Sequence, residues 1–388
     1  MAIRFDKLGV VIAAIAAYGA VVAPFATFRA NRIVAGEPRS ILEALPQWSG
    51  AALLAILGAA ALVALLKTPL ALRLAASVVV LTSLALLIGV AGAHLTPEGN
   101  SFARVSAASG FWLLIFAFTL LLADGLTRLQ LSPVGRVAVL AVAAAAVWLL
   151  LASGAWNDLS LLKEYTNRAD SFWNEASRHV TLALGSLVGA VAVGLPLGIL
   201  CHRVDWLRDG VLNVLNIVQT IPSIALFGIL IAPLGWVAAN VPGAAAIGIR
   251  GIGVAPAFVA LFLYSLLPVV ANTVVGLAGV PRAANEAARG MGMTDWQRLR
   301  GVEFPLAFPV ILTGIRIVLV QNIGLATIAA LIGGGGFGVF VFQGVGQTAM
   351  DLVLLGAVPT VALAFAAAII LDAVIEMAAK GRPVAEAA

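Results

Sequence analysis

Charged residues are scarce in this sequence. Asp, Glu, Lys and Arg make up 11% of its 388 residues, whereas an ordinary soluble domain carries about 25%. Hydrophobic residues make up 62%, which leaves too few polar side chains to cover a water-soluble body of this size. The composition therefore excludes a soluble globule and a disordered chain. It predicts an all-α integral membrane protein that crosses the bilayer many times.

Residue types that bind metals or nucleic acids are also few. Cys201 is the single cysteine, so the sequence offers no internal disulfide and no pair of thiolates. The three histidines, His94, His179 and His202, are scattered over different segments, which argues against a metal site. The net charge is only +5, and we interpret the basic surplus as a membrane topology signal. We therefore predict no metal site and no nucleic-acid partner.

The sequence lacks the motifs of nucleotide-binding proteins and of membrane enzymes. No G-x-x-x-x-G-K-[ST] occurs, so the chain has no P-loop for ATP phosphates. The run 333–338 matches G-x-G-x-x-G, but a dinucleotide site needs a βαβ unit around it, so we interpret the run as a flexible outer loop or gate. There is no H-E-x-x-H and no cluster of intramembrane carboxylates. We predict a protein that is not an enzyme.

Ten stretches are apolar enough to cross a membrane as helices, which takes about 20 residues each. They are Leu8–Phe28, Ser49–Leu66, Leu70–Ala93, Gly110–Leu126, Val134–Leu151, Val180–Cys201, Val211–Ala232, Ile252–Leu277, Leu306–Ile332 and Leu352–Met377. The first stretch is either a retained signal anchor or the apolar region of a cleaved signal peptide. Its length and Phe28 and Arg29 at the cleavage position favour the anchor.

Basic residues indicate the orientation. With the amino terminus in the cytoplasm, the predicted inside segments hold more Lys and Arg than the outside segments. Both termini are then cytoplasmic.

A polar stretch divides the predicted spans into two sets of five. We predict an amino-terminal five-span membrane region of unknown role at 1–153, an extracytoplasmic linker at 154–178 and a transport core at 179–388. The core carries many Pro and Gly residues and polar side chains at membrane depth. These are costly in lipid unless they face protein or a water-filled path, so we expect the core to conduct a substrate.

A charged, amphipathic segment at 281–305 separates the eighth and ninth spans. Its small alanines permit close approach of another protein, one glycine is suited to end a helix, and a proline suits the start of the next span. The segment is either a rigid element that docks into a partner or a helix lying on lipid headgroups, and its spacing favours docking. The residues that define the spacing are Glu286, Ala287, Ala288, Gly292 and Pro305.

This spacing resembles the EAA loop of binding-protein-dependent ABC importer permeases, which reads E-A-A, three residues, G, nine residues, I-x-L-P. Val302 and Phe304 replace the Ile and Leu of that pattern. Other segments are similar to the glycine betaine, carnitine and choline (osmoprotectant) branch, and the resemblance covers about 179–372. The segments are Gln219–Ser223, Leu267–Thr273, Glu286–Thr294, Gly314–Arg316, Asn322–Thr327 and Ala330–Gly333. The five front spans lie outside it, where only a subgroup of longer permeases looks similar.

The resemblance implies a type I ABC importer permease core in the carboxyl-terminal half. It implies a multi-pass permease subunit of the bacterial cytoplasmic (inner) membrane that imports compatible solutes such as glycine betaine. The implied partners are an extracytoplasmic substrate-binding protein, a second permease subunit in a homodimer or heterodimer, and a cytoplasmic ATPase coupled through the EAA loop. The resemblance implies no cofactor in this chain, because the partner ATPase holds the ATP and magnesium.

Residues that interrupt the apolar spans are candidates for the translocation path, with helix packing as the alternative. They are Gln219, Thr220, Pro222, Ser223, Tyr264, Asn272, Arg316, Gln321, Asn322 and Thr327. The Tyr264 ring could contact a quaternary ammonium, although packing is the commoner role of a single aromatic. Arg316 needs a partner or water at its depth, and we favour a structural or gating role for it.

A stand-alone ion-coupled carrier or channel is the alternative from a different functional class. It needs an acidic residue deep in a span as a proton or sodium site. The deepest acids, Asp124, Asp372 and Glu376, lie near predicted helix ends. This placement favours the importer.

Overall fold

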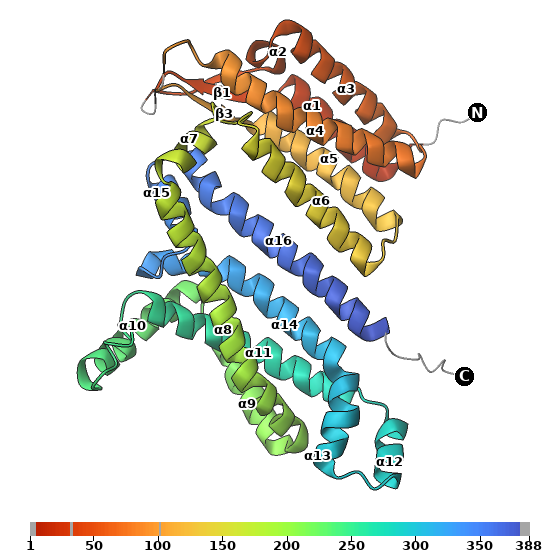
Figure 1. Cartoon of the computed structure of the whole chain (residues 1–388), viewed down its shortest axis with the longest axis vertical. Coiled ribbons are helices and arrows are strands. Elements are labelled where there is room, and N and C mark those ends of the chain that lie inside the picture. Colours follow the sequence, from red (N-terminus) through yellow and green to blue (C-terminus); the bar gives the residue numbers. More distant parts are fainter. Residues whose placement is uncertain (1–4, 32–33, 101, 381–388) are drawn as a thin grey trace. The chain divides into compact units, whose positions relative to one another are not determined.

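The computed structural model describes residues 5–31, 34–100 and 102–380, and the predicted cytoplasmic ends of the chain lie partly outside these ranges. The chain forms two compact units, Met1–Asn167 and Arg168–Ala388. Nearly all regular structure is helical (Figure 1). Among the described residues, nine helices are long and apolar enough to cross a membrane. The prediction of an all-α membrane fold with about ten spans is thus confirmed in its class, and the predicted first and seventh spans differ most from the helices found.

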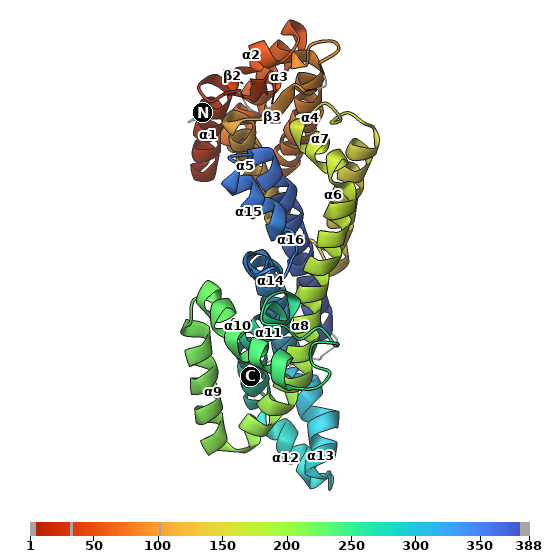
Figure 2. The ribbon, with the colours of Figure 1, turned by 90° about the vertical axis from the view of Figure 1, so that its left-hand side faces the viewer.

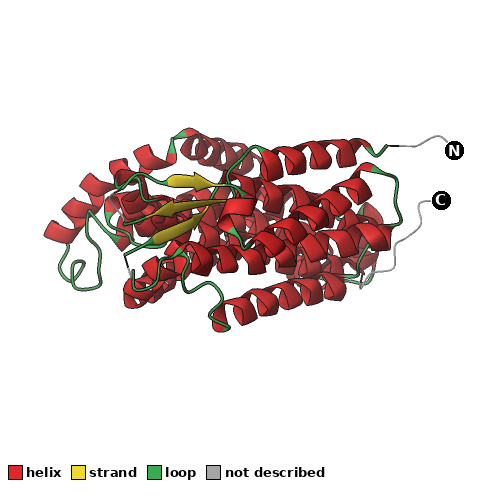
Figure 3. Ribbon diagram, turned by 90° about the horizontal axis from the view of Figure 1, so that it is seen from above, coloured by secondary structure: helices red, strands yellow, loops and turns green. Residues whose placement is uncertain are grey.

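The first unit combines helices with one small sheet (Figure 3). Its elements are α1 Lys7–Val21, β1 Ala26–Arg29, β2 Glu37–Arg39, α2 Ile41–Ala44, α3 Gln47–Leu65, α4 Leu70–Leu95, β3 Arg104–Ala107, α5 Ser109–Arg128, α6 Pro133–Ala152 and α7 Ser160–Asn167. The strands are antiparallel in the order β2-β1-β3, with Ala26 opposite both Arg39 and Ala107. This sheet was not among the elements predicted from the sequence.

The predicted first span, Leu8–Phe28, is wrong at its carboxyl end. Helix α1 has 15 residues and ends at Val21, and Phe28 lies in β1. Pro24 has no N–H for a helical hydrogen bond, so the chain turns before it. At 15 residues α1 is shorter than the about 20 that a span needs.

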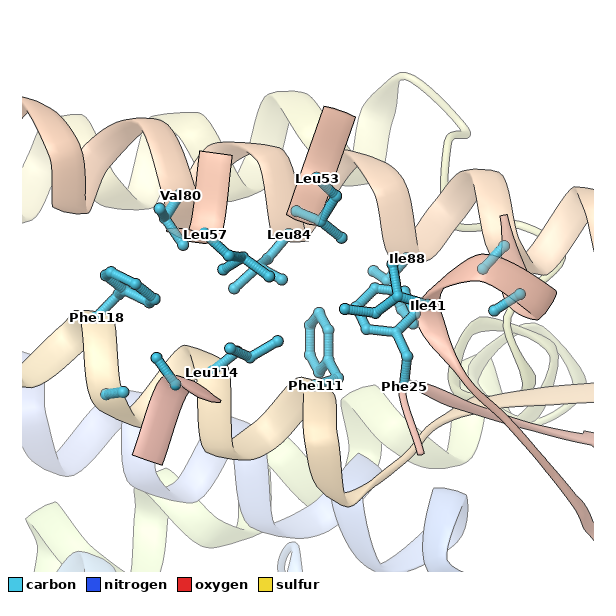
Figure 4. Packing of buried hydrophobic residues seen from close by; sticks show 14 of the residues in the cluster. Phe25, Ile41, Leu53, Leu57, Val80, Leu84, Ile88, Phe111, Leu114 and Phe118 are labelled. Carbon is cyan, nitrogen blue, oxygen red and sulfur yellow. The ribbon is translucent and has the colours of Figure 1, made fainter. Parts of the chain in front are cut away.

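The core of the first unit lies between α4 and α5, with contributions from α1, α2 and α3. Buried residues recur at helical spacing on α5, and Figure 4 shows them facing buried residues of α4. The facing sets are Phe111, Leu114 and Phe118 on α5 and Val80, Leu84 and Ile88 on α4. The other faces of these helices carry exposed apolar side chains such as Phe116 and Leu86, as expected of a surface that contacts lipid.

The second unit is built on three long helices that pack together, α8, α11 and α14. Its elements are α8 Ala169–Arg203, α9 Asp205–Thr220, α10 Ser223–Asn240, α11 Val254–Ala278, α12 Arg282–Gly290, α13 Asp295–Arg298, the π-helix η1 Leu299–Glu303, α14 Phe304–Ala326, the 3₁₀-helix η2 Ile328–Ile332, α15 Gly338–Gly346 and α16 Met350–Lys380. Figures 1 and 2 both place α12 and α13 at one end of this unit and α15 near the other.

The predicted seventh span, Val211–Ala232, is also wrong, because the chain breaks in its middle. Helix α9 ends at Thr220, and α10 begins at Ser223 with Pro222 at its N-cap. Proline disfavours helical backbone at the residue before it, and Ile221 accordingly has an extended conformation, with ψ 125°. Helix α10, not α9, is long and apolar enough to span.

Candidate functional site

The loop at 281–305 folds as a short helix, a turn and a second short helix. Helix α12 follows Pro281, and Thr294 begins α13 by accepting a hydrogen bond from the Gln297 N–H through its side chain. Of the α12 residues, only Ala288 is buried. Glu286 and Ala287 are exposed, so these two predicted docking residues point away from the body of the unit. The third, Ala288, is only 1% exposed and is packed into the unit instead.

Gly292 closes α12, as the sequence predicts. Its φ is +78°, in the left-handed region that favours glycine. The Met293 N–H donates to the Ala288 carbonyl at 3.1 Å, and the Gly292 N–H donates to the Arg289 carbonyl at 2.9 Å. These two bonds form a Schellman motif, which satisfies carbonyls that a helix end otherwise leaves without partners. A Cβ at Gly292 would meet no atom within 4 Å, so only the backbone conformation requires glycine there.

The exposed side of the loop presents large apolar side chains. Met291 is 70% exposed and Trp296 is 67% exposed, and Glu286 and Ala287 of the same loop are exposed too. Aromatic and methionine side chains are enriched at protein interfaces. We call this set of Glu286, Ala287, Met291 and Trp296 the docking face.

A buried carboxylate lies where the loop meets the membrane helices. Glu303 is 2% exposed, and its Oε1 accepts from Nε of Arg298 at 2.9 Å. Arg203, the last residue of α8, also donates to both carboxylate oxygens of Glu303. Arg298 in turn pairs with Asp295 at 2.9 Å. One carboxylate thus binds the loop to the end of α8.

The π-helix η1 accounts for the contact between Arg298 and Glu303. These residues are five apart, a spacing that places side chains on different faces of an α-helix. In a π-helix, hydrogen bonds join residues five apart, here from the Phe304 N–H to the Leu299 carbonyl, so side chains at that spacing come to one face. Such turns are frequent at functional sites.

Asn322 lies at the contact of α8, α11 and α14 and is fully buried. Its Nδ2 is 2.9 Å from Oγ of Ser186 and 2.9 Å from Oγ of Ser265. Both hydroxyls also bond to carbonyls of their own helices, at 2.6 Å to Leu182 and 2.6 Å to Leu261. The structure therefore places this predicted path residue inside the helix packing, where it joins three helices.

Gln219 and Tyr264 are brought together beside the break at Pro222. Nε2 of Gln219 donates to the Tyr264 carbonyl at 2.8 Å, and the Tyr264 hydroxyl donates to the Ile221 carbonyl. The Ile221 carbonyl lies at the break, and the Tyr264 carbonyl lacks its helical donor because Pro268 has no N–H, so both bonds satisfy backbone groups that would otherwise be left free. Tyr264 is 5% exposed, so its ring lies within the packing.

The other path candidates are spread over the second unit. Thr220 and Pro222 are exposed and Ser223 is half-buried, at the junction of α9 and α10. Asn272 bonds to the Pro268 carbonyl of its own helix at 2.8 Å. Gln321 and Thr327 are half-buried, near the carboxyl end of α14.

Arg316 pairs with Asp372, so α14 is joined to α16. Nη1 of Arg316 lies 3.1 Å from Oδ1 of Asp372, and both side chains are partly exposed. A charge within an apolar helix is costly without a partner, and Asp372 supplies one.

The glycine run predicted as a flexible loop or gate is anchored to α8. The Gly336 N–H donates to Oε2 of Glu175 at 2.6 Å, and the Phe337 N–H donates to Nδ1 of His179 at 3.3 Å. Gly335 and Gly336 both have positive φ. In the part of the chain that the structure describes, no group of three His, Cys, Asp or Glu side chains is placed to hold a metal ion.

Four residues that make the polar contacts of Glu303 and Asn322 were not predicted from the sequence: Glu303 itself, Arg203, Ser186 and Ser265. Glu303 occupies the unspecified position of the I-x-L-P pattern, and Arg203 lies 100 residues away at the end of α8. Ser186 and Ser265 resemble ordinary helix-packing serines. The available signal was an acidic residue close to a predicted span boundary, because such a charge requires a cation nearby if it is buried.

Two family models match the chain. The amino-terminal match, residues 6–162, is to the family described as "ABC transporter permease YehY, N-terminal domain". The second, residues 194–380, is to the family described as "Binding-protein-dependent transport system inner membrane component". The two matches fall one in each half of the chain.

Curated relatives align with about half of the chain. The osmoprotectant import permease protein OsmW of Salmonella typhimurium is 47% identical over 178 residues, which cover 46% of this chain and 76% of that protein. The carnitine transport permease protein OpuCB of Listeria monocytogenes is 38% identical, covering 48% of this chain and 78% of its own. The glycine betaine/carnitine/choline transport system permease protein OpuCB of Bacillus subtilis is 38% identical, and the alignment covers 49% of this chain and 80% of that protein. Among solved structures, the methionine ABC transporter MetNI in inward-facing conformations aligns with 54% of this chain and 95% of its own, at a TM-score of 0.47 and 22% identity.

Proposed function

The chain belongs to the binding-protein-dependent ABC importer permeases, and on that premise we propose that it carries osmoprotectants such as glycine betaine, carnitine or choline across the bacterial inner membrane. Its identity to the osmoprotectant permease of Salmonella typhimurium, 47% over 178 residues, carries this choice of substrate class. The second unit, which contains residues 194–380 of the second family match, forms the transport core.

ATP is hydrolysed in this proposal by a separate cytoplasmic ATPase. The docking face supports this, because it exposes Glu286 and Ala287 together with Met291 and Trp296 at one end of the second unit. The ATPase would hold ATP and Mg²⁺, since the chain has no P-loop of its own. An extracytoplasmic binding protein would deliver the solute, and a second permease subunit would complete the path.

Transport requires that ATP binding favour one of two conformations of the permease. Differential contact of the ATPase with the docking face in its two nucleotide states supplies that bias. The alternative, an ion-coupled carrier, finds little support in the described residues. Asp372 pairs with Arg316 and Asp124 pairs with Arg128 at 3.0 Å, so these deep acids are neutralised by arginines.

Uptake into proteoliposomes tests this function. The chain is reconstituted with its co-purified ATPase and binding protein, with ATP inside, and radiolabelled glycine betaine, carnitine and choline are supplied separately. ATP-dependent uptake of at least one of these solutes is expected, and methionine serves as the unrelated control. Uptake driven by a proton or sodium gradient without ATP would contradict the proposal.

A further inference from the structure

We propose that Glu303 is a positioning residue that locks the 281–305 loop to α8, so that α8 and α14 move as one body when a partner displaces the loop. The inference rests on the proposed function, because it assumes that an ATPase moves the loop. No residue of the E-A-A…G pattern makes this connection. The docking face receives the force, and Glu303 passes it to the membrane helices.

The attachment of the loop to the membrane helices is narrow. Helix α12 buries only Ala288, so packing holds it weakly to the rest of the unit. At the other end of the loop, Arg298 and Glu303 are 5% and 2% exposed and bonded to each other. Force applied to the docking face therefore reaches the helices through η1, by its ion pairs and by Leu299, which lies in one buried cluster with Leu277 of α11 and Ile311 of α14.

Arg203 attaches the loop to a second membrane helix, α8. Glu303 precedes α14 directly, whereas Arg203 ends α8, so their bonds join two spans that are distant in sequence. A guanidinium that donates to both oxygens of one carboxylate fixes its orientation as well as its distance. The same two helices are joined again at Asn322 and Ser186. Two polar connections, one at the loop and one deeper, oppose sliding or rotation of α8 against α14.

The charges explain why a neutral residue at position 303 would break the connection between the loop and α8. Its carboxylate lies between the guanidinium groups of Arg203 and Arg298. Without that negative charge, two like charges would face each other in a partly buried site, which is unfavourable. Arg203, 33% exposed, would turn outward, and the loop would lose its connection to α8.

The test distinguishes a loss of coupling between ATP hydrolysis and transport from a loss of ATPase binding. Arg203→Gln leaves the pairs of Arg298 with Glu303 and Asp295 in place and removes only the connection to α8. Glu303→Gln removes both connections. Arg208→Gln is the matched control, because Arg208 pairs with two exposed acids of α9, Asp205 and Asp209, which lie outside the loop. Each variant is purified with its ATPase, reconstituted with the binding protein, and assayed for solute transported per ATP hydrolysed.

We expect Arg203→Gln and Glu303→Gln to retain the ATPase in wild-type amounts and to hydrolyse ATP, but to transport at least fivefold less solute per ATP. The double variant is expected to fall no further than the lower single variant, since both remove the same connection. Arg208→Gln should match wild type. The proposal would be overturned if Arg203→Gln transported as much solute per ATP hydrolysed as wild type, whether or not transport and hydrolysis had both fallen.

A conservative variant keeps the proposal testable if Arg203→Gln does not accumulate in the membrane. Arg203→Lys retains the charge but not the two-pronged donor, and a ratio two- to threefold below wild type is expected. An unchanged ratio in Arg203→Lys would overturn the inference in that case. Failure of the proposed function is distinguishable, because the wild-type complex would then import none of the three solutes.

Discussion

Nδ2 of Asn322 on α14 lies 2.9 Å from Oγ of Ser186 on α8. The same nitrogen bonds to Ser265 on α11, so one buried amide joins three helices of the transport core. Polar contacts between membrane helices contribute because an unsatisfied amide in an apolar interior is costly.

Asn322→Ala should therefore destabilise the core. We expect a loss of about 1 to 2 kcal/mol, because the amide's hydrogen bonds to both serines are removed. The midpoint of thermal unfolding of the purified protein in detergent measures the effect. Gln321→Ala, at the half-buried neighbouring position, is the control and should shift the midpoint little. Equal midpoints for the two variants would show that the three-helix contact does not depend on this amide.

Gly292→Ala should weaken binding of the ATPase without preventing membrane insertion. The left-handed backbone costs a residue with a Cβ about 1 to 2 kcal/mol, so the end of α12 would rearrange. Gly290→Ala is the matched control, because Gly290 is helical and a Cβ there also meets no atom within 4 Å. Titration of detergent-solubilised permease with purified ATPase should give roughly tenfold weaker binding for Gly292→Ala only. Equal affinities would mean that the turn does not shape the docking face.

The first unit should lose stability in acid through Asp6. The Gly9 N–H, at 2.8 Å, is the main cause that lowers the pKa of the Asp6 carboxyl below 3.8, with Arg73 and Arg128 acting in the same direction against burial. A carboxyl with a lowered pKa in the folded state stabilises the fold above its unfolded pKa, and this stabilisation is lost as pH falls through the folded value.

Thermal unfolding of wild type and Asp6→Asn, measured between neutral pH and pH about 3, tests this linkage. We expect wild type to be the more stable near neutral pH and the difference to shrink below pH 3.8. A difference that stays constant over the whole range would show that the ionised carboxylate contributes nothing.

The accumulation of the protein in the membrane should depend on the ion pair between Arg316 and Asp372. Removal of the acid by Asp372→Asn leaves a charge on α14 at membrane depth, which costs about 2.5 to 3.5 kcal/mol at the centre of a span. We therefore expect Asp372→Asn to lower the amount of protein in the membrane, and Arg316→Gln combined with Asp372→Asn to restore part of it. Quantitative immunoblots of membrane fractions measure both. A double variant that accumulates less than either single variant would contradict the pairing.

The loop at 281–305 could be predicted from sequence because its features are local. Gly292 needs a left-handed backbone and Pro305 suits the first turn of a helix, and both positions follow from spacing along the chain. The long apolar helices were equally accessible, since about 20 apolar residues suffice to identify a span.

Features that depend on distant residues could not be predicted. Glu303 and Arg203 are 100 residues apart, and Asn322 and Ser186 are 136 apart, so no pattern in one sequence connects them. The strands have three or four residues, too few for an alternating pattern to be recognised. The break at Pro222 was visible as a proline, but the apolar residues on both sides favoured one continuous span.

The most direct test of the central claim, that this permease subunit works with a separate ATPase through the 281–305 loop, is co-purification from the native membrane. Wild type and Gly292→Asp are purified side by side in mild detergent, and every bound protein is identified by mass spectrometry. We predict that an ATPase subunit accompanies wild type and is lost from Gly292→Asp, which places a charge and backbone strain next to Met291 of the docking face. A chain that purifies alone in both forms would contradict the claim.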